Sequence, residues 1–307
     1  MVNFADRVAE KIESTGPLVV GLDPHFSLLP PFLLRKWFDE ERSLEALSLC
    51  VRDFNLTLLE ILAGEVGFVK IQAAFYEALG VSGMMVLKET IDKAQASGFL
   101  VILDGKRNDI SSSAEAYARG YLSEIEVAGE VLPSFWNVDA LTVNPYLGED
   151  GLRPFVQEAA KHGKGIFVLA RTTNPSAAFL QDEGKEEKVF VKVAHLAWSL
   201  GQNSLGESGR SSVGIVVGAT YPEDMRFLRE RFPGLLFLIP GVGTQGGDPE
   251  ALQSAFGADG KGALVNVSRD VIFAFREGPD RDGFRFAQEA RDRARFYQQK
   301  FWGLIRR

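Results

Sequence analysis

The chain has 307 residues, 46% of them hydrophobic and 24% charged, which is ordinary for a globular protein. Its formal net charge of -7 gives no support to a nucleic acid or an anionic membrane as a partner, although a small anionic substrate could still bind at a locally basic site. The single cysteine, Cys50, excludes a disulfide within the chain.

The amino-terminal segment MVNFADRVAEKIES predicts a charged amphipathic helix. It contains no long apolar run, so the sequence predicts neither a signal peptide nor a transmembrane span. We therefore expect a cytoplasmic protein.

Eight short apolar runs then follow along the chain, and most of them are continuous rather than alternating. They predict strands at residues 17–23, 67–72, 99–104, 140–145, 165–170, 213–219, 235–241 and 262–268. Continuous apolar runs are typical of strands that are buried on both faces, as in a parallel sheet covered by helices. Helical patterns, such as those at residues 43–64 and 81–98, separate the runs.

This alternation predicts one α/β domain over residues 1–307, folded as a (β/α)8 TIM-type barrel. The alternative is an open doubly wound sheet, but eight strands of similar length favour closure. A helical extension is expected at about residues 280–307, where aromatic and basic residues recur at helical spacing. We expect this helix to pack on the barrel rather than to bind nucleic acid or a membrane.

Charged residues gather where the predicted strands end, which is where a barrel of this type carries its active site. The stretch VILDGKRND places Asp104, Lys106 and Asp109 after a buried strand. Asp104 and Lys106 are two residues apart, so their side chains share a face if the chain stays extended. Lys70 lies inside another apolar run and needs partners, because a lone buried ammonium is unfavourable.

Asp23, at the end of the first strand, can belong to the same cluster. The charges of Asp23, Lys70, Asp104 and Lys106 sum to zero, which makes an alternating network plausible. A purely structural group of salt bridges is the alternative for any one of these residues. Together, at one end of a barrel, they favour a functional site.

A glycine-rich stretch, PGVGTQGG at residues 240–247, predicts an anion site. Glycines let backbone N–H groups approach an anion closely, and in TIM-type barrels the loops after the last two strands often hold a phosphate. Arg269 follows the last strand and can add a bidentate contact. A glycine-rich turn alone is weak evidence, but its position and Arg269 favour phosphate binding. No zinc-ligand spacing, Walker loop or GxSxG motif is present in the sequence.

The chain resembles the orotidine 5′-phosphate decarboxylase family, and most closely its longer bacterial branch. The resemblance extends over nearly the whole chain and rests on VVGLDPHF, FVKIQAAFYE, LDGKRNDISSSAEAYA, LTVNPYLG, IPGVGTQGGD and NVSR. Its most specific part is the Asp-x-Lys-x-x-Asp motif with a lysine on an upstream strand. The resemblance implies that the protein decarboxylates orotidine 5′-phosphate to UMP in de novo pyrimidine biosynthesis. It also implies that the reaction uses neither a cofactor nor a metal.

The resemblance also implies roles for individual residues. Lys106 would donate the proton to C6, and Asp104 would face the substrate carboxylate. Lys70 and Asp23 would extend the charge network and contact the ribose hydroxyls. Asp109 would reach the site of the other subunit of a homodimer with shared active sites.

The remaining substrate contacts follow from the same resemblance. Ile110 and Ser113 would line the shared wall between subunits, and Thr173 would read the pyrimidine. The phosphate would be held by Gln245, Gly246, Gly247 and Arg269.

Four features depart from the family pattern. Gly105 and Asn108 fill spacer positions of the motif with unusual residues, and Thr173 stands where serine is usual. The carboxy-terminal extension is longer than the family pattern predicts, and we assign it no function.

Two other functions compete with this interpretation. A sugar-phosphate decarboxylase on the same barrel, such as 3-keto-L-gulonate 6-phosphate decarboxylase, shares the motif but uses Mg²⁺ held by an acid on the second strand. Lys70 occupies that position here and would repel the ion. A non-catalytic nucleotide sensor should have lost Lys106 or Asp109, and both are present.

Overall fold

Eight parallel strands close into a barrel in the computed structural model, which describes residues 2–243 and 250–305. Around the barrel the strands follow the order β1-β10-β9-β8-β7-β6-β3-β2. Their bounds are β1 Leu18–Leu22, β2 Phe68–Gln72, β3 Leu100–Arg107, β6 Ala140–Val143, β7 Gly165–Arg171, β8 Val213–Val217, β9 Phe237–Ile239 and β10 Ala263–Val267. Each of the eight predicted strands corresponds to one of these, so the predicted TIM-type barrel is confirmed and the open sheet is excluded.

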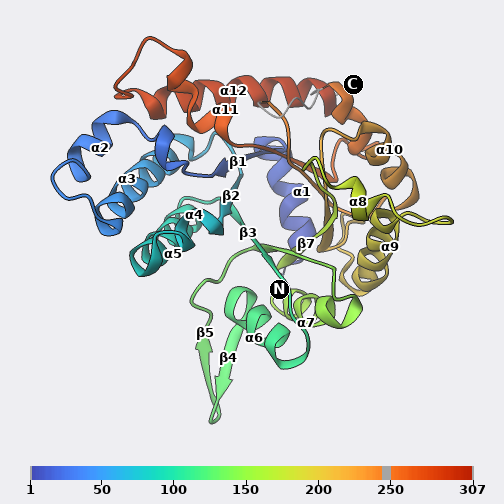
Figure 1. Ribbon diagram of the computed structural model, residues 1–307. Coiled ribbons are helices and arrows are strands. Elements are labelled where there is room, and N and C mark those ends of the chain that lie inside the picture. Colours follow the sequence, from blue (N-terminus) through green and yellow to red (C-terminus); the bar gives the residue numbers. More distant parts are fainter. Residues whose placement is uncertain (1, 244–249, 306–307) are drawn as a thin grey trace.

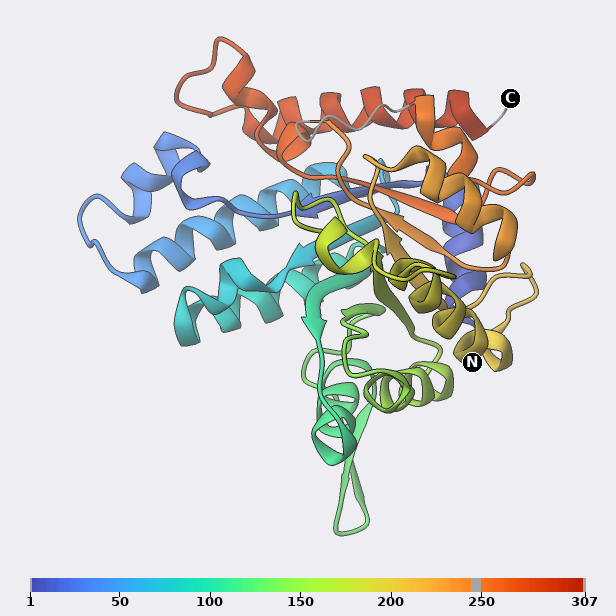
Figure 2. The same ribbon diagram turned by 45° about the vertical axis from the view of Figure 1, so that its right-hand side comes forward.

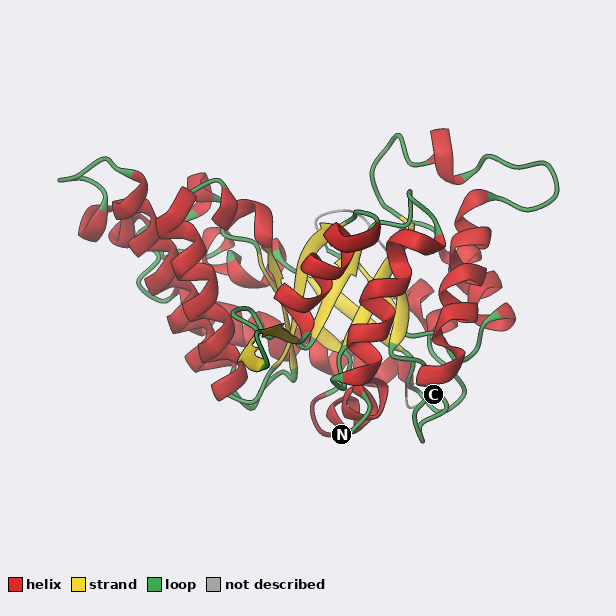
Figure 3. Ribbon diagram, turned by 90° about the horizontal axis from the view of Figure 1, so that it is seen from below, coloured by secondary structure: helices red, strands yellow, loops and turns green. Residues whose placement is uncertain are grey.

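Helices surround the barrel, as Figures 1 and 3 show. The α-helices are α1 Phe4–Thr15, α2 Pro31–Trp37, α3 Leu44–Leu62, α4 Ala73–Glu77, α5 Gly80–Ala96, α6 Ser111–Leu122, α7 Glu149–Lys161, α8 Ala178–Gln181, α9 Val189–Gly201, α10 Pro222–Arg231, α11 Arg269–Ile272 and α12 Phe286–Ile305. Short 3₁₀ helices lie at Phe26–Leu28, Gln202–Ser204, Glu250–Ala255 and Ala274–Glu277. Among the residues that the structure describes, no helix is both long and apolar enough to cross a membrane.

The amino-terminal helix α1 closes the bottom of the barrel. Its residues Phe4, Val8 and Ile12 are buried in one cluster with inward-facing strand residues such as Phe167. The Phe4 and Phe167 rings meet edge to face with centroids 6.2 Å apart. Gly165, at the start of β7, makes this approach possible, because a Cβ atom there would lie 2.2 Å from the Phe4 ring. The barrel interior is therefore a packed core at its amino-terminal end.

The carboxy-terminal helix α12 lies across the outside of the barrel and contacts α3 and β1 (Figure 1). Phe286, at its start, stacks on Phe54 of α3 with ring centroids 5.0 Å apart, and Phe301 is fully buried. The helix thus packs on the barrel as its sequence pattern predicts. That residues 1–307 form a single domain stays a prediction.

A β-hairpin that the sequence did not predict follows α6. Its strands β4 (Glu124–Val127) and β5 (Glu130–Pro133) pair antiparallel and project away from the barrel in Figures 1 and 2. All eight strand residues are exposed, including Ile125 and Leu132. Short strands in which exposed apolar residues are mixed with glutamates give no buried-strand pattern, which explains the missed prediction.

Candidate active site

Asp104 and Lys106 meet at the carboxyl end of β3, but not in the way the sequence predicted. The ladder with β6 pairs Leu103 with Leu141 and then Arg107 with Val143, so a bulge separates the two pairs. Lys106 has a φ of 47°, a left-handed conformation that residues other than glycine rarely adopt. The strand is therefore not regularly extended here. The two side chains nevertheless meet, with Lys106 Nζ 2.6 Å from Asp104 Oδ1.

Lys70 extends this pair into a network from the neighbouring strand β2. Its Nζ lies 3.1 Å from Asp104 Oδ2 and 3.4 Å from Asp23 Oδ1. Lys70 and Asp104 are both buried, whereas the side chain of Lys106 is 45% exposed. The predicted cluster of Asp23, Lys70, Asp104 and Lys106 therefore exists, and two of its members are out of solvent.

The charges in this network hold one another ionised. Burial alone would lower the pKa of Lys70, but the carboxylates of Asp23 and Asp104 outweigh burial and raise that pKa above its ordinary value. Burial would likewise raise the pKa of Asp104, but Lys70 and Lys106 hold it well below its usual range. Lys70 and Asp104 thus face each other as buried, oppositely charged groups.

Two further polar groups contact Asp104, and sequence reasoning missed both as site residues. Gln72, at the end of β2, donates from Nε2 to Asp104 Oδ2 at 3.0 Å. Thr142 of β6 donates from Oγ1 to Asp104 Oδ1 at 2.8 Å. Gln72 could have been found, because it shares a strand face with Lys70. Thr142 gave no such signal, since threonine is an ordinary strand residue.

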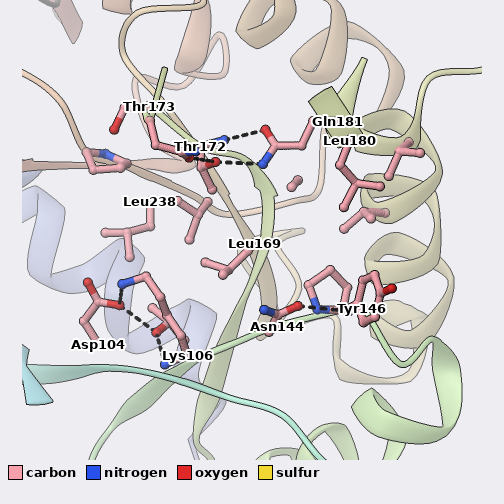
Figure 4. Close-up of a pocket in the computed structure, with 18 of the residues that line it drawn as sticks. Asp104, Lys106, Asn144, Tyr146, Leu169, Thr172, Thr173, Leu180, Gln181 and Leu238 are labelled. Atoms are coloured by element: carbon pink, nitrogen blue, oxygen red, sulfur yellow. Dashed lines mark hydrogen bonds and ion pairs between the residues drawn. The ribbon is translucent and has the colours of Figure 1, made fainter. Parts of the chain in front are cut away.

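A cavity of about 650 Å³ opens beside the network (Figure 4). Asp104 and Lys106 lie at one side of it, while Thr172 and Gln181 lie at another, with Leu169 and Leu238 between them. Further lining residues include Lys70, Thr142, Asn144, Tyr146, Thr173 and Val216. An apolar middle with polar groups at its edges suits a flat heterocyclic ring.

A second cavity, of about 310 Å³, continues from the first, and Lys70, Asp104 and Thr173 line both. Its other polar residues include Asp23, His25, Asn266, Ser268 and Arg269. Burial, followed by the nearby Arg269, lowers the pKa of His25 despite the opposing effect of Asp23. Among the described residues, Arg269 and Lys70 are the lysine and arginine side chains that line this cavity. The predicted phosphate residues Gln245, Gly246 and Gly247 lie outside the residues that the structure describes.

Asp109, Ile110 and Ser113 do not join the site of their own chain. Asp109 Oδ1 accepts a hydrogen bond from the Ile110 backbone N–H, at 2.8 Å. Asp109 and Ser113 line a separate hollow on α6 with Tyr117 and Trp136. Ile110 and Ser113 are exposed. None of these three predicted site residues therefore lines either cavity of its own chain.

Arg171, at the end of β7, is a structural residue rather than a cavity residue. Its buried guanidinium lies 2.9 Å from Asp224 and 3.1 Å from Asp182, and its centre is 3.8 Å from the centroid of the Tyr221 ring. Asp182 follows α8, the short helix that carries Leu180 and Gln181 into the first cavity. Arg171 therefore anchors the loop that forms one wall of the site.

The described residues contain no group of three or more His, Cys, Asp or Glu side chains that could hold a metal ion. In the network, the Lys70 ammonium pairs with both the Asp23 and the Asp104 carboxylates, and the Lys106 ammonium pairs with Asp104.

Comparisons with known proteins identify relatives of this arrangement. The model of the Orotidine 5′-phosphate decarboxylase / HUMPS family matches residues 16–276. The orotidine 5′-phosphate decarboxylase of Rhodopirellula baltica is 43% identical over 278 residues, which are 90% of this chain and 90% of that protein. The protein of the same name from Caldicellulosiruptor bescii is 40% identical over 279 residues, 90% of this chain and 91% of its own. The solved structure of Leishmania donovani OMP decarboxylase is 28% identical, with a TM-score of 0.75 and all of both chains covered.

Proposed function

The chain belongs to the orotidine 5′-phosphate decarboxylase / HUMPS family, and from that premise we propose that it is the carboxy-lyase that converts orotidine 5′-phosphate to UMP in pyrimidine biosynthesis. A cytoplasmic location is part of the same proposal and rests on the family alone. The observation that carries the proposal is the Asp23–Lys70–Asp104–Lys106 network at the mouth of the barrel.

The proposed decarboxylation requires a cation near the reacting carbon, C6. Loss of CO2 from C6 of the pyrimidine leaves an electron pair on a carbon that has little resonance stabilisation. We propose that the Lys106 ammonium offsets this charge and then donates a proton to C6, so that neither a cofactor nor a metal is needed. Lys106 suits the role because its side chain is half-exposed to the cavity while Asp104 fixes its ammonium.

Asp104 has two effects in this scheme. It orients Lys106, and its own charge would lie beside the substrate carboxylate, which disfavours the bound substrate relative to the transition state. Lys70 keeps Asp104 ionised throughout, because its ammonium is buried against that carboxylate.

The two connected cavities match the two ends of the proposed substrate. The larger one, with Leu169 and Leu238 in its wall, would take the pyrimidine, with Thr173 at its edge. The smaller one, which Arg269 and Asp23 line, would take the phosphate and the ribose. Binding the distant phosphate supplies free energy that can be used at the reacting carbon.

We further propose a homodimer in which Asp109 completes the partner's site. The supporting observation is that Asp109 and Ile110 follow shortly after the catalytic strand, yet neither lines a cavity of the site in its own chain. Ile110 is a half-exposed apolar side chain at this position, which suits a wall shared between subunits.

The test separates this reaction from that of a Mg²⁺-dependent sugar-phosphate decarboxylase. The position of Lys70 disfavours the Mg²⁺-dependent reaction, because its ammonium occupies the space beside Asp104 that a divalent ion would need. Purified protein should consume orotidine 5′-phosphate, followed by its loss of absorbance, at the same rate in EDTA and in added Mg²⁺. Absence of turnover in both conditions would refute the proposal, and turnover only with Mg²⁺ would refute its metal-free mechanism.

A further inference from the structure

The bulge in β3 leaves the backbone of Lys106 without a regular strand partner. The ladder pairs Leu103 with Leu141 and Arg107 with Val143. Between these two pairs, β3 has three residues, 104 to 106, whereas β6 has one, Thr142. The Lys106 backbone N–H donates instead to the Thr142 side chain, with the nitrogen 3.0 Å from Oγ1. A side-chain hydroxyl thus replaces the missing backbone acceptor.

The same hydroxyl also holds the catalytic carboxylate. Thr142 Oγ1 donates to Asp104 Oδ1 at 2.8 Å, and this is the oxygen that lies 2.6 Å from Lys106 Nζ. A hydroxyl has one donor and two acceptor positions, so Thr142 can make both bonds at once. It therefore connects Asp104 and the backbone of Lys106 through a single atom.

Packing alone does not explain a threonine at this position. Thr142 is 1% exposed on a strand whose other three residues are fully buried and apolar. Valine has nearly the same shape and would suit such a strand. The hydroxyl is thus the feature that needs an explanation, and both of its bonds go to the Asp104–Lys106 pair.

Lys106 needs this support more than a regular strand residue would. Its φ of 47° is unfavourable for a residue with a Cβ, so the surrounding contacts must maintain it. Its side chain is 45% exposed, and among the described residues its ion pair is with Asp104. Any rotation of Asp104 or shift of the Lys106 backbone would therefore move the ammonium.

We propose that Thr142 is a positioning residue of the decarboxylation, whose hydroxyl fixes both Asp104 and the Lys106 backbone so that the ammonium is held against the reacting carbon. This inference rests on the proposed function. It assigns Thr142 an effect on the chemical step and not on substrate binding.

The experiment compares Thr142→Val, which removes the hydroxyl at nearly constant shape, with Thr142→Ser, which restores it. Thr90→Val is the matched control, because Thr90 is also fully buried and donates to the Val86 carbonyl, away from the cavities. For each protein, kcat and KM for orotidine 5′-phosphate, Kd for UMP and the melting temperature are measured beside wild type.

We expect Thr142→Val to lower kcat by about ten- to a hundredfold, since a displacement of an ångström in a catalytic group can have an effect of that size. KM and the Kd for UMP should stay within about twofold, and Thr142→Ser should recover most of kcat. Thr90→Val should lower the melting temperature without lowering kcat.

Three results would overturn the inference: an unchanged kcat in Thr142→Val, an equal loss in Thr142→Ser, or a loss of UMP binding as large as the loss of kcat. If wild type turns over the substrate and Thr142→Val does so equally well, only this inference fails. If wild type itself is inactive, the proposed function fails and the inference fails with it.

Discussion

Lys70 Nζ lies 3.1 Å from Asp104 Oδ2, and both groups are buried side by side on neighbouring strands of the barrel. The pair is not needed to build a barrel, because apolar residues of similar volume at such positions are often as stable or more so. A buried ion pair at the carboxyl end of the strands therefore favours a catalytic explanation. It also makes the site sensitive to the loss of one partner.

Replacing Lys70 with methionine should destabilise the protein. The change leaves the Asp104 carboxylate buried with less compensation, so we expect a loss of about 3 to 5 kcal/mol in the free energy of unfolding. Urea unfolding at neutral pH measures it. Lys106→Met is the matched control, because its half-exposed ion pair should contribute less than about 1 kcal/mol. Equal losses in the two variants would contradict the assignment of Lys70 as the buried member.

The contribution of Asp104 to stability should depend on pH in one direction. Its folded pKa is lowered, so the stabilisation is complete above the ordinary carboxyl pKa near 4 and is lost as the pH falls below it. Lys70, whose pKa is raised, keeps its charge up to and beyond its ordinary pKa of about 10.4. The difference in unfolding free energy between wild type and Asp104→Asn should thus be constant between about pH 6 and 9 and shrink below about pH 4. A difference that changes steeply around pH 7 would show that the network titrates there.

Replacing Arg269 with alanine should weaken phosphate recognition. A hydrogen bond to a charged group contributes about 1.5 to 3 kcal/mol, so kcat/KM should fall roughly ten- to a hundredfold. Arg276→Ala removes a nearby exposed arginine that lines neither cavity and serves as the control. Steady-state kinetics of both variants test the assignment. Equal effects at the two positions would point to general electrostatic attraction instead of a specific contact.

The proposed sharing of sites predicts complementation between two inactive variants. Asp109→Ala and Lys106→Ala should each be nearly inactive alone, but a mixed dimer would contain one intact site. Statistical mixing at equal amounts makes half of the dimers mixed, so about a quarter of the wild-type sites should be restored. Activity is measured after the two proteins are unfolded together and refolded. No recovery, with mixed dimers demonstrated, would mean that Asp109 acts within its own chain or not at all.

The barrel could be predicted because its strands are continuous apolar runs, and the charge cluster because Lys70 and Asp104 are out of place in such runs. The meeting of Asp104 with Lys106 was predicted for the wrong reason, since the bulge and the left-handed Lys106 backbone depend on pairing with β6. Thr142 could not be identified for the same reason. Its importance comes from a partner 38 residues away on another strand, which no local pattern records.

The measurement that tests the central claim most directly is the turnover of orotidine 5′-phosphate by wild type and Lys106→Met in EDTA, with UMP binding measured on both. We predict sustained turnover by wild type. The variant should bind UMP but lose kcat by about a thousandfold or more, because it lacks both the proton and the charge that the reaction needs. A variant that binds UMP and keeps kcat within about tenfold of wild type would contradict the assignment of Lys106 as the proton donor.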